Sequence, residues 1–140
     1  MSVYQSSPSP WPDRMLAILR IVAGLVFISA GTMKLFGYPH SPVQMPPFTL
    51  LSEIGIAGIL ETFGGLLIVV GLLTRPVAFV LAGEMAVAYF QFHFPKSFFP
   101  SINGGIPAVL FCFVFLYLMF AGAGPWSVDA WLVRSRRAGG

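Results

Sequence analysis

The sequence predicts an all-α fold: an integral membrane four-helix bundle with both termini in the cytoplasm. Four long apolar stretches fill most of the 140 residues. Charged residues make up only 9% of the chain, against about 25% in an ordinary soluble domain. Most of the basic residues lie at the ends of the stretches that would share one face of a bilayer. A very apolar soluble helical core is the alternative, but no stretch has a clear polar face.

The predicted spans cover residues 15–36, 54–73, 77–94 and 105–121. A hydrocarbon core about 30 Å thick needs about 20 apolar residues at a rise of about 1.5 Å per residue, and each stretch is close to that length. We expect a cytoplasmic N-terminal tail over residues 1–13, a membrane domain over 14–122, and an interfacial short helix with a basic cytoplasmic tail over 123–140. A cleaved signal peptide is the alternative for the first span. Its apolar run is longer than the usual 7–15 residues, so we expect it to be retained.

Basic residues set the predicted orientation. Six of them would share one face of the membrane: Arg14, Arg20, Arg75, Arg134, Arg136 and Arg137. The positive-inside rule places that face, and with it both termini, in the cytoplasm. Trp11, Trp126 and Trp131 flank spans on the same side, as interfacial aromatic residues do. After them, Ser127 is predicted to cap a short helix on the inner membrane surface.

Four ionisable residues fall inside the predicted spans: Arg20, Lys34, Glu61 and Glu84. A charge at mid-bilayer costs about 2.5–3.5 kcal/mol on insertion scales, so such groups face the bundle and form pairs. Helical spacing puts them on the faces that carry the packing glycines, which are Gly24, Gly31, Gly58, Gly64 and Gly65. From the depth of each residue we predict the pairs Arg20–Glu84 and Lys34–Glu61. We also predict that Arg75 pairs with Asp129 and ties the C-terminal helix to the turn between spans 2 and 3.

These buried charges have two interpretations. Ion pairs can fix the register of the helices, or the carboxylates can carry protons or hold the polar headgroup of a ligand. Gln91 and His93 extend the polar set at the outer end of span 3, where His93 is either a plain interfacial residue or a partner of a quinone-like headgroup. A bis-His haem would also require His40, which lies in a loop. No haem, metal or nucleotide motif is present, and the charge pattern indicates topology instead of nucleic-acid binding. The single Cys112 excludes an intramolecular disulfide or a CxxC exchange motif.

Several short motifs, in their order and spacing, resemble the DoxX family of small four-span bacterial membrane proteins. They cover roughly residues 14–131: Arg20-Ile21-Val22-Ala23-Gly24, Gly31-Thr32-Met33-Lys34-Leu35, Glu61-Thr62-Phe63-Gly64-Gly65, Gly71-Leu72-Leu73-Thr74-Arg75, Glu84-Met85-Ala86-Val87-Ala88 and Gly122-Ala123-Gly124-Pro125-Trp126-Ser127-Val128-Asp129. One departure concerns span 4. Similar proteins often carry a glutamate shortly after Asn-Gly-Gly, whereas here Asn103-Gly104-Gly105 is followed by Ile106-Pro107.

The resemblance implies a multi-pass protein of the bacterial inner (plasma) membrane. Relatives resemble the quinone-linked subunit of a thiosulfate-oxidising enzyme or anchor oxidative-stress complexes to the membrane. We therefore expect a subunit or anchor of a membrane redox complex, with quinone as the candidate cofactor and a soluble or membrane redox protein as partner. Such a chain would be an oxidoreductase subunit without a cofactor motif of its own. The alternatives are a small transporter that handles protons or solutes, in which oligomers could supply the room that one chain lacks, and a purely structural membrane assembly factor.

Overall fold

The computed structural model describes residues 9–44, 46–47 and 49–139, and all the regular secondary structure over these residues is helical. This confirms the predicted all-α class. The helices are α1 (Trp11–Phe36), α2 (Glu53–Ile59), α3 (Gly65–Val70), α4 (Thr74–Ala88), α5 (Pro100–Asn103), α6 (Ile106–Ala121) and α7 (Val128–Ala138). Two π-helical turns, Leu60–Gly64 and Tyr89–His93, continue α2 into α3 and extend α4.

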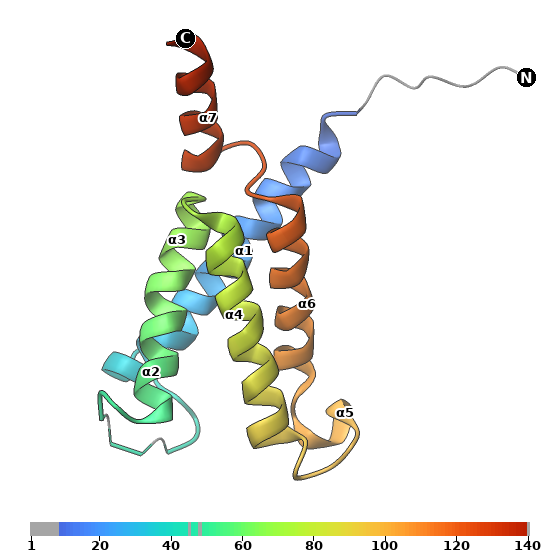
Figure 1. Cartoon of the computed structure of the whole chain (residues 1–140). Coiled ribbons are helices and arrows are strands. Elements are labelled where there is room, and N and C mark those ends of the chain that lie inside the picture. Colours follow the sequence, from blue (N-terminus) through green and yellow to red (C-terminus); the bar gives the residue numbers. More distant parts are fainter. Residues whose placement is uncertain (1–8, 45, 48, 140) are drawn as a thin grey trace, which may run out of the picture.

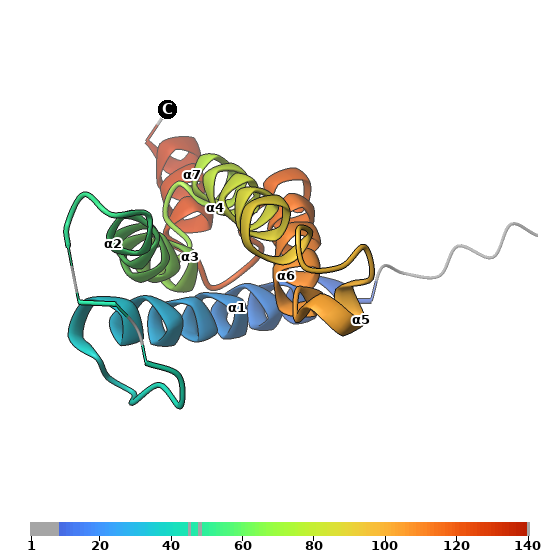
Figure 2. The same ribbon diagram turned by 90° about the horizontal axis from the view of Figure 1, so that it is seen from below.

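The long helices form two packed pairs. α1 packs against the α2–α3 rod, and α4 packs against α6. α1 runs obliquely across the other rods (Figure 1), which is also clear from below (Figure 2). We call the end with α7 and the α3–α4 turn the tail end, and the end with α5 and the α1–α2 connection the loop end (Figure 1).

A short turn joins α3 to α4 at the tail end. Gly71 ends α3 with φ of 70°, and Leu73 precedes α4 with φ of 52°. Glycine adopts the left-handed region without a steric penalty, so Gly71 can close α3 with backbone bonds to the carbonyls of Leu67 and Ile68. The α2–α3 rod and α4 are therefore antiparallel neighbours.

Two helical stretches, Trp11–Phe36 and Glu53–Val70, are long and apolar enough to cross a membrane, and Ile106–Ala121 is a shorter apolar helix. Large apolar side chains also point outward. Leu25, Phe79 and Phe113 are 53%, 62% and 66% exposed, and they come from α1, α4 and α6. Burying a side chain of this kind is worth about 1.5–3 kcal/mol, so an outer surface of this composition fits an apolar solvent better than water.

Glycines set the close approach between α1 and the α2–α3 rod. A Cβ atom built on Gly24 would lie 2.7 Å from the carbonyl oxygen of Gly65. A Cβ atom on Gly31 would overlap Thr62 and lie 2.8 Å from the carbonyl oxygen of Gly58. No larger side chain fits at these contacts, so the two backbones can approach only through glycine.

Gly58 and Gly64 lie against side chains instead of backbone. A Cβ atom on Gly58 would lie 2.9 Å from the side chain of Leu35 of α1. A Cβ atom on Gly64 would lie 2.9 Å from Leu81 of α4. All five glycines selected from the sequence are therefore at helix contacts, and Gly64 is the one that faces α4.

The C-terminal helix begins as predicted. The Ser127 side chain accepts a hydrogen bond from the backbone N–H of Ala130 and caps α7. The helix projects beyond the ends of α3 and α6, away from the bundle (Figure 1). The place of α7 on the inner membrane surface stays a prediction. Asp129 holds the first turn of α7 against the α3–α4 turn.

Candidate functional site

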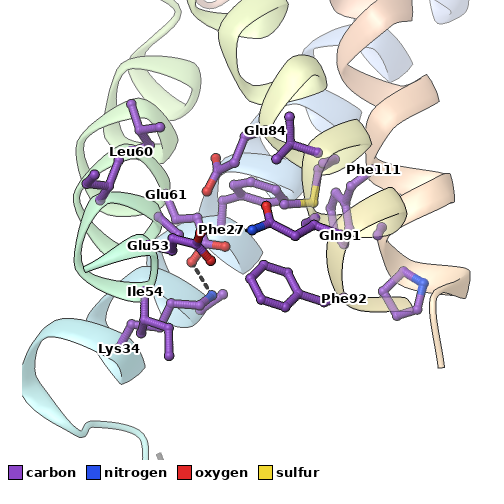
Figure 3. A pocket seen from close by; sticks show the side chains of 18 of the residues that line it. Phe27, Lys34, Glu53, Ile54, Leu60, Glu61, Glu84, Gln91, Phe92 and Phe111 are labelled. Carbon is purple, nitrogen blue, oxygen red and sulfur yellow. Dashed lines mark hydrogen bonds and ion pairs between the residues drawn. The ribbon is translucent and has the colours of Figure 1, made fainter. Parts of the chain in front are cut away.

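A cavity of about 800 Å³ lies between α1, the α2–α3 rod, α4 and α6. Most of its wall is apolar. Six polar or charged side chains line it: Lys34, Glu53, Glu61, Glu84, Gln91 and His93 (Figure 3). Five of these were selected from the sequence, and the structure brings them to one site. The volume falls within the usual range of about 300–1,000 Å³ for small-molecule sites.

Lys34 and Glu61 form the predicted ion pair. The Nζ atom of Lys34, in the last turn of α1, lies 2.5 Å from Oε2 of Glu61 (Figure 3). The Glu61 side chain is 5% exposed and that of Lys34 is 25% exposed. The pair therefore satisfies a deeply buried carboxylate with an ammonium group that keeps contact with the surface.

Glu84 has no partner in the described part of the chain. Both of its carboxyl oxygens are buried, and neither accepts or donates a hydrogen bond. Its side chain projects from α4 into the upper part of the cavity (Figure 3). The predicted Arg20–Glu84 pair is therefore wrong.

Arg20 is fully buried and bonds to backbone carbonyls instead. Its Nη1 donates to the carbonyl of Ile68 at 2.7 Å and also to that of Val69. Its Nε and Nη2 donate to the carbonyls of Ala123 and Trp126, both at 2.8 Å. The last carbonyls of a helix have no partner within the helix and attract a cation, which explains why the guanidinium group turns to the end of α3. Arg20 thus joins α1, α3 and the segment after α6, outside the cavity.

Arg75 and Asp129 do not pair either. The two carboxylate oxygens of Asp129 accept hydrogen bonds from the backbone N–H groups of Leu73 and Thr74, each at 2.9 Å. Arg75 donates to the carbonyl of Met119 at 3.3 Å. The free N–H groups at the start of α4 are better placed for Asp129 than the guanidinium group, because a helix N-terminus favours an anion. The tether between α7 and the α3–α4 turn exists, but it is made through backbone atoms.

At the loop end, a second polar contact crosses the cavity. Nε2 of Gln91 donates to Oε1 of Glu53 at 2.8 Å, which links the extension of α4 to α2. Sequence reasoning missed Glu53, because an acidic residue just after a Ser cap is an ordinary helix start. Here Ser52 accepts from the N–H of Gly55. His93 lies with Nδ1 3.0 Å from the carbonyl oxygen of Asn103, so one of its ring nitrogens is already engaged.

Both π-helical turns border the cavity. Glu61 belongs to the first turn, and Gln91 and His93 belong to the second. A π turn accommodates an extra residue and changes which residues face a neighbour, and such turns are frequent at functional sites. Hydrophobic periodicity gives no sign of them, so the sequence did not predict them.

The wall contributed by α6 is apolar. Pro107, Ala108 and Phe111 are its lining residues, which agrees with the missing glutamate after Asn103-Gly104-Gly105. Phe111 packs edge to face on Phe27 of α1 with ring centroids 4.9 Å apart. The cavity therefore has polar groups on three sides and an aromatic surface on the fourth.

Within the residues that the structure describes, no cluster of three or more His, Cys, Asp or Glu side chains is arranged to hold a metal ion. Cys112 is a half-buried free thiol on α6. The polar groups of the cavity can instead offer hydrogen bonds and one ammonium–carboxylate pair. The protein is therefore all-helical, and its cavity is suited to a small amphipathic molecule.

The family model described as DoxX matches residues 15–94, and the chain belongs to the DoxX family. An uncharacterized protein of Haemophilus influenzae is 41% identical over 117 residues, covering 81% of this chain and 87% of that protein. The inner membrane protein YqjF of Escherichia coli is 33% identical over 137 residues, covering 84% and 91%. An uncharacterized membrane protein of Mycobacterium tuberculosis is 25% identical over 162 residues, covering 99% and 96%. No solved structure matches the chain.

Proposed function

We propose that this chain is a multi-pass protein of the bacterial inner membrane. In it, α1, the α2–α3 rod, α4 with its π turn, and α6 each cross the bilayer. The names of the Escherichia coli and Mycobacterium tuberculosis relatives support the membrane location. The exposed apolar side chains support it independently. The basic residues around α7 and the α3–α4 turn favour a cytoplasmic tail end, with both termini on that side.

We further propose that the protein is a subunit or anchor of a membrane redox complex that holds a quinone-type molecule in the cavity. The observation that carries this proposal is the buried carboxyl group of Glu84, which has no hydrogen-bond partner among the described residues and lies beside a mostly apolar space of about 800 Å³. A neutral carboxyl group can donate a hydrogen bond to a carbonyl oxygen, and Phe27 and Phe111 offer aromatic faces for a ring. Electrons would come from a partner protein, since the sequence contains no cofactor motif.

Binding of a short-chain quinone to the purified protein in detergent tests the ligand proposal. We expect saturable binding, and we expect it to weaken by about tenfold in Glu84→Leu, which corresponds to one lost hydrogen bond of about 1.4 kcal/mol. Arg134→Gln on α7 is the control and should bind as the parent does. An unsaturable signal, or equal binding by Glu84→Leu and the parent, would refute the ligand proposal and leave only the anchor role.

A second candidate is a small transporter for protons or a polar solute, which the same unpaired Glu84 favours. Flux in proteoliposomes that disappears in Glu84→Gln would support it over the redox role. A structural assembly factor is the third candidate. A stable protein partner that co-purifies with the chain while the cavity holds no ligand would favour that role.

A further inference from the structure

Glu84 differs from the other carboxyl groups at the cavity. Glu61 is paired with Lys34, and Glu53 accepts a hydrogen bond from Gln91. Among the described residues, Glu84 has no partner for either of its buried oxygens. An unpaired carboxylate in apolar surroundings costs several kcal/mol, and the group avoids this cost by binding a proton or a ligand. No structural contact of Glu84 explains why a carboxyl group is present there.

The other polar groups of the cavity all lie on the loop-end side of Glu84. Lys34 is two residues from the end of α1, and Glu53 is the first residue of α2. Gln91 follows Glu84 by seven residues, about 10 Å along the helix. Figure 3 shows Glu84 above the group formed by Glu61, Lys34, Glu53 and Gln91. A cavity of about 800 Å³ with polar groups along one side has room for water, which takes about 30 Å³ per molecule.

The tail-end side of Glu84 is closed by apolar side chains. The fully buried apolar side chains on this side come from α3, α4 and α6: Ile68, Ala78, Leu81, Phe115 and Leu118. Beyond them lies Arg20, whose guanidinium group already donates to four carbonyls. Thr74, at the start of α4, is also fully buried, and its hydroxyl group has no hydrogen-bond partner among the described residues. It precedes Glu84 by ten residues, about 15 Å along the helix, so the described residues offer no continuous polar route from Glu84 to the tail end.

We propose that Glu84 is a proton-exchange site that communicates with water at the loop end only. The proton moves between a carboxyl oxygen of Glu84 and water, or between that oxygen and a hydroxyl group of a bound ligand, and no electron moves in this step. The titratable groups that face the site are Lys34 of α1, Glu53 of α2, Glu61 of the first π turn and His93 of the second. α6 contributes none to the cavity wall. The inference deepens the proposed function, and on the proposed topology the loop end is the outer face.

Carbodiimide labelling of right-side-out and inverted membrane vesicles tests this proposal. Dicyclohexylcarbodiimide enters from the lipid and reacts with protonated carboxyl groups, so modification of Glu84, measured by mass spectrometry, reports its protonation. The pH is changed in one compartment at a time. We expect labelling to follow the compartment at the loop end and to fall by about tenfold per pH unit on the alkaline side of the titration. Glu84→Gln removes the label, whereas Asp13→Asn, at an exposed position outside the cavity, retains it.

Labelling that follows the tail-end compartment, or that ignores pH in both compartments, would overturn the proposal. The parent protein alone decides this point, so the test does not depend on the folding of a variant. Quinone binding is scored separately on the same preparation. Sided labelling without quinone binding would support proton exchange and remove the quinone proposal. Quinone binding with labelling that is not sided would support the quinone proposal and overturn proton exchange from the loop end.

Discussion

The Lys34–Glu61 pair should respond unequally to the loss of either partner. Lys34→Met leaves the Glu61 carboxyl group, 5% exposed, without its counter-charge. Removing one member of a buried pair typically costs about 3–5 kcal/mol, and we expect about 3 kcal/mol because Glu61 can take up a proton. Glu61→Gln leaves the Lys34 ammonium group, which is 25% exposed and can turn toward the loop end. We expect this change to cost about 1 kcal/mol, close to that of one lost hydrogen bond.

The double variant, Lys34→Met with Glu61→Gln, removes both charges together. We expect it to be destabilised by only about 1–2 kcal/mol, which gives a coupling energy of about 2–3 kcal/mol between the two side chains. Reversible unfolding in mixed detergent–dodecyl sulfate micelles measures the free energy of unfolding of all four proteins. Gly83→Ala is the control, because a Cβ atom there meets nothing within 4 Å. Strictly additive effects, or a larger cost for Glu61→Gln than for Lys34→Met, would refute the reasoning.

Three further changes probe the packing and the tail end in the same unfolding assay. Gly31→Leu should cost at least about 2 kcal/mol because its side chain overlaps Thr62, whereas Gly83→Leu faces open space and should be nearly neutral. Arg20→Met should lower the free energy of unfolding by about 3–4 kcal/mol, roughly 1 kcal/mol for each carbonyl that loses its hydrogen bond. Arg20→Lys should restore little of this stability, since one ammonium group cannot reach all four carbonyls. Asp129→Ala should cost about 1–2 kcal/mol and make the start of α4 more accessible to hydrogen exchange. Parent-like stability of any of the three destabilising variants would contradict its contact.

The partners of the buried charges were predicted with mixed success, and the difference is physical. Lys34 and Glu61 were matched by helical register and depth, and the pair is present at 2.5 Å. The same reasoning failed for Arg20, because counting along helices considers side chains but not the free carbonyls at a helix end. Those carbonyls become available only when α3 ends beside α1, which is a property of the packed structure.

The prediction for Asp129 failed because its partners are free backbone N–H groups and not a charged side chain. Its predicted partner, Arg75, is a charged side chain, but the α3–α4 turn presents two free backbone N–H groups at the point where α7 begins. Sequence reasoning also missed Glu53, whose role depends on Gln91 of a distant helix lying across the cavity. In each case the decisive partner is a group whose position cannot be read from local sequence.

By itself, the sequence determined the helical class, the apolar surface, the glycine faces and the presence of carboxyl groups within apolar helices, because these follow from composition and periodicity along single helices. Only the tertiary structure decided which carboxyl group has a partner and which has none. It also introduced the π turns and opened a cavity beside Glu84. These features arise from the distances between helices, and those distances depend on how every neighbouring side chain packs.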